Sequence, residues 1–130
     1  MENEQLYMRI KKGNHGAFTI VELMIVVTVI GMMLAIAIPN FVRARDTSQL
    51  AAIYNNLRII ETAKDQWALE NKKGTGVPTD IPILSDYLRG GTIKLIVSEV
   101  YESNLIGSPA FATANVRLGT YAPHDQISAQ

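Results

Sequence analysis

The stretch LMIVVTVIGMMLAIAIPNFV, residues 23–42, decides the fold of this chain. It runs for 20 residues without a charged side chain. At about 1.5 Å per residue, a helix of this length is roughly 30 Å long, which matches the hydrocarbon core of a bilayer. The stretch is therefore predicted to be a helix that can cross a membrane.

The residues in front of this stretch contain the cations Arg9, Lys11 and Lys12. Such cations ahead of an apolar run are typical of an export signal and favour a cytoplasmic N-terminus. Arg43 and Arg45, just beyond the run, oppose that orientation. The expected topology therefore has the N-terminus in the cytoplasm, as the cations before the run favour.

The order of the small and apolar residues is inverted relative to a secretory signal. A secretory signal has an apolar region of about 7–15 residues, followed by small residues where the peptidase cuts. Here the small residues Gly16 and Ala17 precede the apolar run. Cleavage at this point would leave the hydrophobic helix at the start of the mature protein.

The segment GAFTIVEL at residues 16–23, the long apolar run and AIPNF at residues 37–41 resemble the prepilin N-terminus of type IV pilins and type II secretion pseudopilins. The resemblance covers residues 9–60. In that family the mature chain begins with an N-methylated Phe, with Glu fifth and Pro twenty-second. Counted from Phe18, Glu22 is fifth and Pro39 is twenty-second.

The residue before the cleaved bond departs from the family pattern. That residue is usually Gly, whereas here Ala17 lies between Gly16 and Phe18. Cleavage after Gly16 would make Glu22 sixth and Pro39 twenty-third. The two spacings therefore favour cleavage after Ala17 and methylation of Phe18, and mass spectrometry of the mature N-terminus distinguishes the two sites.

Glu22 allows two interpretations. A carboxylate deep in a bilayer is costly, about 2.5–3.5 kcal/mol at its centre, so an acidic residue in an apolar helix needs a reason. In one interpretation Glu22 lies near the headgroups without a partner, favoured by the helix dipole. The resemblance implies the other, in which Glu22 pairs with the α-amino group of Phe18 on a neighbouring subunit and fixes the register between subunits.

Gly31 and Pro39 interrupt an otherwise strong apolar helix. Pro39 removes a backbone donor and clashes with the preceding turn, so a kink or a locally melted stretch is expected. Alternatively, Gly31 lets another helix approach closely. The resemblance implies that residues 31–39 loosen when subunits assemble.

Beyond residue 42 the helical period continues, and one helix is predicted from about residue 18 to 71. Apolar residues recur at helical spacing, while charged residues are expected to face elsewhere. The apolar stripe consists of Leu50, Ile53, Leu57, Ile60, Ala63 and Trp67, and the charged residues are Arg58, Glu61, Asp65 and Lys72. The segment KKGTG, residues 72–76, lacks phosphate-loop spacing and is predicted to be the helix C-cap.

The remaining residues predict a small antiparallel sheet that covers this stripe. A short helix at residues 81–88, capped by Asp80 and stopped by Gly90 and Gly91, is expected first. Strands are expected at residues 93–97, 100–106 and 112–118, with a turn at 107–109 and a loose polar tail at 121–130. The fold class is α+β and pilin-like, with a long N-terminal helix packed on a small C-terminal sheet.

Composition argues against several functions. Twelve Lys and Arg balance twelve Asp and Glu, and the basic residues are dispersed, so nucleic-acid binding is not predicted. There is no cysteine, and the two histidines, His15 and His124, are separated by the apolar run. No catalytic residue, metal site or cofactor is predicted. The calcium site of some pseudopilins is not expected either, because Asp125 is the only acid after Glu102.

The resemblance implies a subunit of a helical filament. The expected parts are a leader at residues 1–17, a membrane and assembly helix at 18–42 and a periplasmic domain at 43–130. The implied partners are copies of the chain, a prepilin peptidase, an inner-membrane platform and its ATPase. A type II secretion pseudopilin is favoured. The alternatives are a type IV pilin for adhesion, motility or DNA uptake, and a single-pass membrane protein that binds a partner without polymerising.

Overall fold

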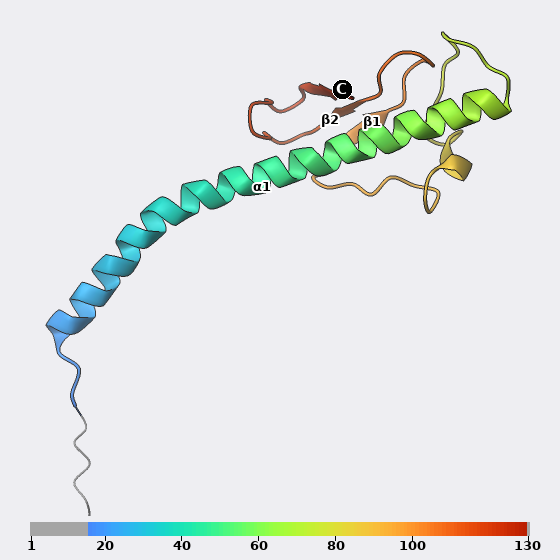
Figure 1. Ribbon diagram of the computed structural model, residues 1–130. Helices are drawn as coiled ribbons and strands as arrows, with labels where there is room; N and C mark the ends of the chain where they lie inside the picture. The colour runs from blue at the N-terminus through green and yellow to red at the C-terminus, as the bar shows by residue number, and fades with distance from the viewer. Residues whose placement is uncertain (1–15, 130) are drawn as a thin grey trace, which may run out of the picture. The chain divides into compact units, whose positions relative to one another are not determined.

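The computed structural model describes residues 16–129, and Figure 1 shows them as one long helix and a small sheet. The expected α+β, pilin-like class is confirmed. Two compact units, residues 1–37 and 38–130, divide the chain, and each is described by itself. The elements are α1 (Ile20–Glu70), the 3-10 helix η1 (Ser85–Tyr87), β1 (Val100–Glu102), β2 (Phe111–Thr113) and β3 (Gln126–Ser128).

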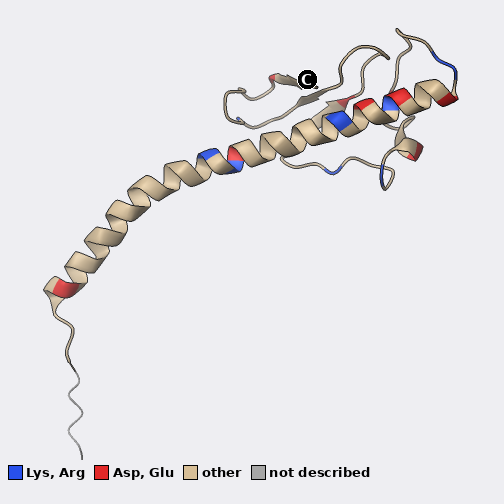
Figure 2. Cartoon of the chain, in the orientation of Figure 1, with Lys and Arg blue, Asp and Glu red and all other residues tan. Residues whose placement is uncertain are grey.

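In the first unit, α1 is a fully exposed apolar helix. Every large apolar side chain from Ile20 to Ile36 is at least 45% exposed. An 18-residue window of α1 has a mean hydropathy of 2.6, and none of it is buried. Figure 2 shows no Lys, Arg, Asp or Glu on this part of the helix beyond its first turn. By length and composition, the helix can cross a membrane.

The helix is continuous through Gly31 and Pro39. All residues of the 31–39 segment are helical, and Pro39 lies inside α1. The locally melted stretch considered from the sequence is therefore not found in the single subunit. A Cβ added to Gly31 would meet nothing within 4 Å, so this surface is open to a close neighbour.

In the second unit, the predicted apolar stripe of α1 forms the core. Ile53, Leu57, Ile60 and Ala63 are at most 1% exposed, and Leu50 and Trp67 pack against them at the edges. Their spacing of three and four residues places them on one face of the helix. One expected outward residue differs, because Glu61 is half-buried and takes part in hydrogen bonds.

The helix ends as the KKGTG segment predicts, although a lysine adopts the left-handed conformation expected of glycine. Lys72 has φ 53°. The Lys73 amide donates to the Ala68 carbonyl at 2.9 Å and the Lys72 amide to the Leu69 carbonyl at 3.4 Å. These two bonds are the Schellman arrangement, which satisfies carbonyls at the end of a helix.

The three strands form an antiparallel sheet in the order β1-β2-β3. Tyr101, Ala112 and Ile127 are aligned across it and are all buried. They join the α1 stripe in one hydrophobic cluster. The strands lie beside the second half of α1 in Figure 1. The sheet therefore covers the apolar face of the helix, as predicted.

Several strand boundaries differ from the prediction. Residues 93–97 form no strand, and the strands expected at 100–106 and 112–118 are shortened to β1 and β2. The tail expected to be loose contains β3, since Ile127 is 1% exposed and the Ala129 amide donates to the Ala110 carbonyl at 3.0 Å. A single apolar residue in a polar tail gave no periodic signal. The turn at residues 107–109 is confirmed.

The expected helix at residues 81–88 is a run of tighter turns that ends in η1. Its amides mostly bond three residues back, as the Leu84 amide does to the Ile81 carbonyl at 3.1 Å. Leu84 and Leu88 are buried in the core and hold the segment in place. The predicted stop is confirmed, because Gly90 and Gly91 have φ of 86° and 76°.

Candidate functional site

The bond predicted to be cleaved lies in an exposed, non-helical segment. Gly16, Ala17 and Phe18 precede α1 and are all exposed, Phe18 at 78%. The segment is therefore accessible, and cleavage after Ala17 and methylation of Phe18 stay predictions. The leader cations Arg9, Lys11 and Lys12, together with His15, lie outside the described residues.

Glu22 has a partner within its own subunit. The Glu22 amide donates to the Thr19 hydroxyl at 3.1 Å, and Glu22 Oε2 accepts from the Thr19 amide at 3.4 Å and the Thr19 hydroxyl at 3.3 Å. This is a capping box, in which a Thr and a Glu three residues later satisfy free amides at a helix start. The spacing Thr19-x-x-Glu22 is the sequence signal of this capping box.

The capping box leaves capacity for a second partner. Within residues 16–129 the hydrogen bonds to the carboxylate all reach Oε2, so Oε1 is available. Glu22 is the one acid in the first turn of α1 and lies on an exposed surface. Both interpretations of Glu22, a headgroup-level carboxylate without a charged partner and a carboxylate paired with a neighbouring subunit, stay predictions.

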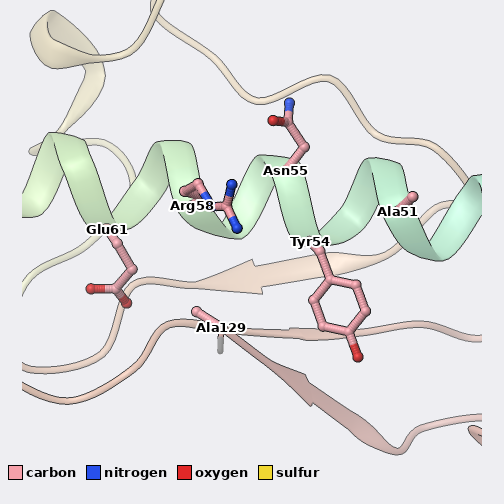
Figure 3. A pocket seen from close by; sticks show the side chains of 6 residues that line it. All are labelled: Ala51, Tyr54, Asn55, Arg58, Glu61 and Ala129. Atoms are coloured by element: carbon pink, nitrogen blue, oxygen red, sulfur yellow. The ribbon is translucent and has the colours of Figure 1, made fainter.

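The groove in Figure 3 lies along α1 in the second unit and has a volume of about 540 Å³. Its wall contains Tyr54, whose hydroxyl lies 2.8 Å from that of Tyr121. This hydrogen bond and burial raise the pKa of Tyr54. Arg58 is exposed at the rim. Among the lining residues there is no nucleophile beside a base, so the groove has no catalytic constellation.

The Glu61 carboxylate borders this groove and forms hydrogen bonds that hold the fold together. Glu61 Oε1 accepts from the Lys64 ammonium at 3.0 Å and from the Ala110 amide. Lys64 is 0% exposed and also donates to the Ser103 carbonyl at 2.8 Å and the Ser108 carbonyl at 2.6 Å. The pair therefore ties the loop between β1 and β2 to α1. The apolar stripe of the sequence did not predict a buried lysine.

A family model and two characterised relatives are similar to this chain. Residues 12–38 match the model of the prokaryotic N-terminal methylation motif. The chain is 36% identical over 76 residues to the type IV major pilin protein PilA of Myxococcus xanthus, a match that covers 57% of this chain and 34% of the relative. It thus spans about a third of that pilin.

A second relative is similar over more of the chain. The type II secretion system core protein G of Escherichia coli is 21% identical over 122 residues, which covers 86% of this chain and 79% of the relative. No solved structure matches the chain.

A long exposed apolar helix, a methylation motif at its start and a small sheet on its second half define a pilin-like protein. The chain therefore has a prokaryotic N-terminal methylation motif and is similar to one type IV pilin and to one type II secretion core protein.

Proposed function

We propose that this chain is the structural subunit of a helical filament and is held in the inner membrane before assembly. A prepilin peptidase cuts it after Ala17, and Phe18 is then methylated. Residues 18–42 anchor the mature subunit, with the domain at 43–130 in the periplasm. An inner-membrane platform and its ATPase drive the subunit into the filament.

The observation that carries the proposal is the wholly exposed apolar surface of α1. Large apolar residues from Ile20 to Val42 are 45–79% exposed and have no cover from the described residues 16–129. Soluble monomers rarely expose so large a patch, and lipid or other copies of the helix must cover it. A subunit that leaves the lipid therefore has to pack its helix against the same helix of other subunits.

Glu22 supplies the register between subunits in this proposal. Its free Oε1 would accept the α-amino group of Phe18 on a neighbour. In a low-dielectric bundle an unpaired charge is strongly unfavourable, so a misaligned contact is rejected. The helical segment 31–39 would loosen on assembly to let the bundle pack.

The substitution Glu22→Ala tests the pairing. We expect the variant to insert into the membrane in normal amount but to form few or no filaments, counted by electron microscopy of sheared fibres. Glu102→Ala, which changes an exposed acid on β1, is the matched control and should assemble normally. Filaments of Glu22→Ala at the control level would contradict the pairing.

Within the family we favour a type II secretion pseudopilin, whose filament pushes exported proteins through an outer-membrane pore. The match to core protein G spans 86% of this chain, against 57% for the pilin, and supports this choice. A type IV pilin is the second candidate, supported by the higher identity of 36%. Removing the chain from its host should abolish protein export if the first is right and surface fibres if the second is.

A further inference from the structure

A second groove lies at the beginning of the periplasmic domain. Its volume is about 480 Å³. Arg45, Asp46 and Gln49 of α1 form one wall, while Ile96, Val116 and Arg117 belong to two loops that form the rest. Two loops about 20 residues apart in the sequence therefore meet the same turns of the helix. We call Arg45, Asp46, Ile96, Val116 and Arg117 the proximal surface, in which two arginines outnumber one acid.

The proximal surface begins close to the end of the uncharged run of α1. The α1 residues that it contacts follow Val42, the last residue of the uncharged run, by three to seven positions. In a helix this is about 5–10 Å. The interfacial layer of a bilayer is about 5–8 Å thick on each side of the hydrocarbon. If residues 23–42 cross a membrane, the turn of α1 that both loops meet therefore begins within the headgroup layer.

The chemistry of the proximal surface suits an anionic headgroup layer. Ile96 and Val116 are 37% and 45% exposed, and Arg45 and Arg117 lie beside them. Within the described residues the one ion pair is that of Lys64 and Glu61, so these arginines have no acidic partner there. Arginines around small apolar side chains bind the negative surface while the apolar groups enter the interface.

The loop that carries Ile96 is held rigidly in place. The Glu99 carboxylate is buried and accepts from the Ile96 amide at 2.9 and 3.0 Å and from the Val97 amide at 2.7 Å. The Tyr101 hydroxyl donates to it at 2.6 Å and accepts from Asn56 of α1 at 2.8 Å. A preformed loop loses little entropy when it docks.

We propose that the proximal surface docks on the anionic lipid headgroups of the membrane that residues 23–42 cross. The inference rests on the membrane anchoring in the proposed function. It gives the domain a defined contact with the bilayer before assembly. That contact has to be released when the subunit moves into the filament.

The test uses the full chain in vesicles and exploits its lack of cysteine. A single cysteine at Val116 carries an environment-sensitive fluorophore, and matched chains carry it at Thr62 or Val29. Thr62 lies 20 residues beyond Val42, about 30 Å along α1, whereas Val29 is inside the apolar run. Vesicles contain phosphatidylcholine alone or with phosphatidylglycerol, and a headgroup-level nitroxide lipid acts as quencher.

We expect the Val116 label to be shielded from water and quenched in vesicles with phosphatidylglycerol, and less so without it. The Thr62 label should be unquenched in both. Arg45→Gln and Arg117→Gln should each lower the ratio of docked to free domain about fivefold, because an arginine near an anionic surface contributes on that scale. Arg58→Gln, about 24 Å beyond Val42, should change nothing.

The labels separate the failure of this inference from that of the anchoring. A lipid-shielded Val29 label with a water-exposed Val116 label in both vesicle types overturns the docking and leaves the anchoring intact. Shielding of Val116 that follows protein density and not phosphatidylglycerol also overturns it, since a second copy would then cover the surface. A water-exposed Val29 label overturns both proposals.

Discussion

The two halves of α1 share one backbone conformation, but they differ in how far their apolar side chains are exposed. From Ile20 to Val42 the large apolar side chains are 45–79% exposed. From Ile53 to Ala63 the apolar stripe is at most 1% exposed, because the chain supplies its own cover. The apolar face of the second half is buried within the subunit. The apolar surface of the first half can be buried only by lipid or by further subunits.

This difference separates stability from assembly. Burial of apolar surface stabilises a fold only where the fold itself buries that surface. Substitutions in the second half should therefore change the unfolding of the domain. Substitutions in the first half should leave the domain intact and change only membrane insertion and filament formation.

The largest expected effect on stability comes from Lys64→Ala. The substitution leaves the Glu61 carboxylate and the carbonyls of Ser103 and Ser108 without their shared donor. Breaking one side of a buried pair costs about 3–5 kcal/mol. Urea unfolding followed by circular dichroism should show this loss, while Lys94→Ala, an exposed lysine, should show almost none. Equal stability of the two variants would contradict the role of Lys64.

Leu57→Ala and Val26→Ala test the comparison most directly. Leu57 is 0% exposed, so its truncation leaves a cavity and should cost the domain about 2–5 kcal/mol. Val26 is 45% exposed on the first half, and its truncation should leave the unfolding midpoint of the domain unchanged. A matching loss in Val26→Ala would mean that the first half is packed within the subunit.

A smaller effect should follow from acid. Desolvation would raise the pKa of Glu99, but hydrogen bonds from Tyr101, Val97 and Ile96 outweigh it and lower the pKa. The unfolded chain then binds the proton more readily, so stability is full above about pH 4.5 and falls as the pH drops through the lowered pKa. Acid titration of the unfolding free energy should show this fall.

Glu99→Gln should flatten that part of the pH profile. The amide oxygen still accepts a hydrogen bond, so the loss at neutral pH should be about 1–2 kcal/mol. Glu102→Gln changes an exposed acid on β1 and is the control that keeps the wild-type profile. An unchanged acid profile in Glu99→Gln would assign the pH dependence to another group.

The smallest expected effect is that of Thr19→Ala. Loss of the capping hydroxyl should cost the start of α1 about 0.5–2 kcal/mol and speed hydrogen exchange of the Glu22 amide. Thr28→Ala removes a hydroxyl that bonds only to the Met24 carbonyl within the helix, so it should leave the Glu22 amide protected. Equal exchange in both variants would refute the capping box.

The parts predicted well from the sequence are those with long periodic signals. The apolar run and the stripe from Leu50 to Trp67 gave the helix and the core face, because a repeat of 3.6 residues over many turns has few other interpretations. The Lys72-to-Gly76 segment gave the helix end. The positions of Glu22 and Pro39 relative to Phe18 predicted the resemblance to prepilins, and the methylation motif matches at residues 12–38.

The parts predicted poorly depend on contacts that are distant in the sequence. β3 exists because Ile127 aligns with Ala112, and strands of three residues are too short to show a period. The alternating residues 93–97 form a loop instead, since Glu99 and Asn56 satisfy their backbone groups. Lys64 is buried because loop carbonyls from residues 103 and 108 meet its ammonium group.

By itself, then, the sequence determined that a helix longer than a bilayer would form and that its first half would be uncovered. The charge, the apolar length and the residue spacing are properties of one contiguous stretch of sequence, so the sequence alone predicts them. Only the tertiary structure decided which loops meet the helix, how Lys64 and Glu99 hold them and that Ile96, Val116 and Arg117 gather beside Arg45. Those outcomes depend on packing between segments that are distant in the sequence. The free energy of that packing belongs to the contact between two segments and cannot be inferred from either one alone.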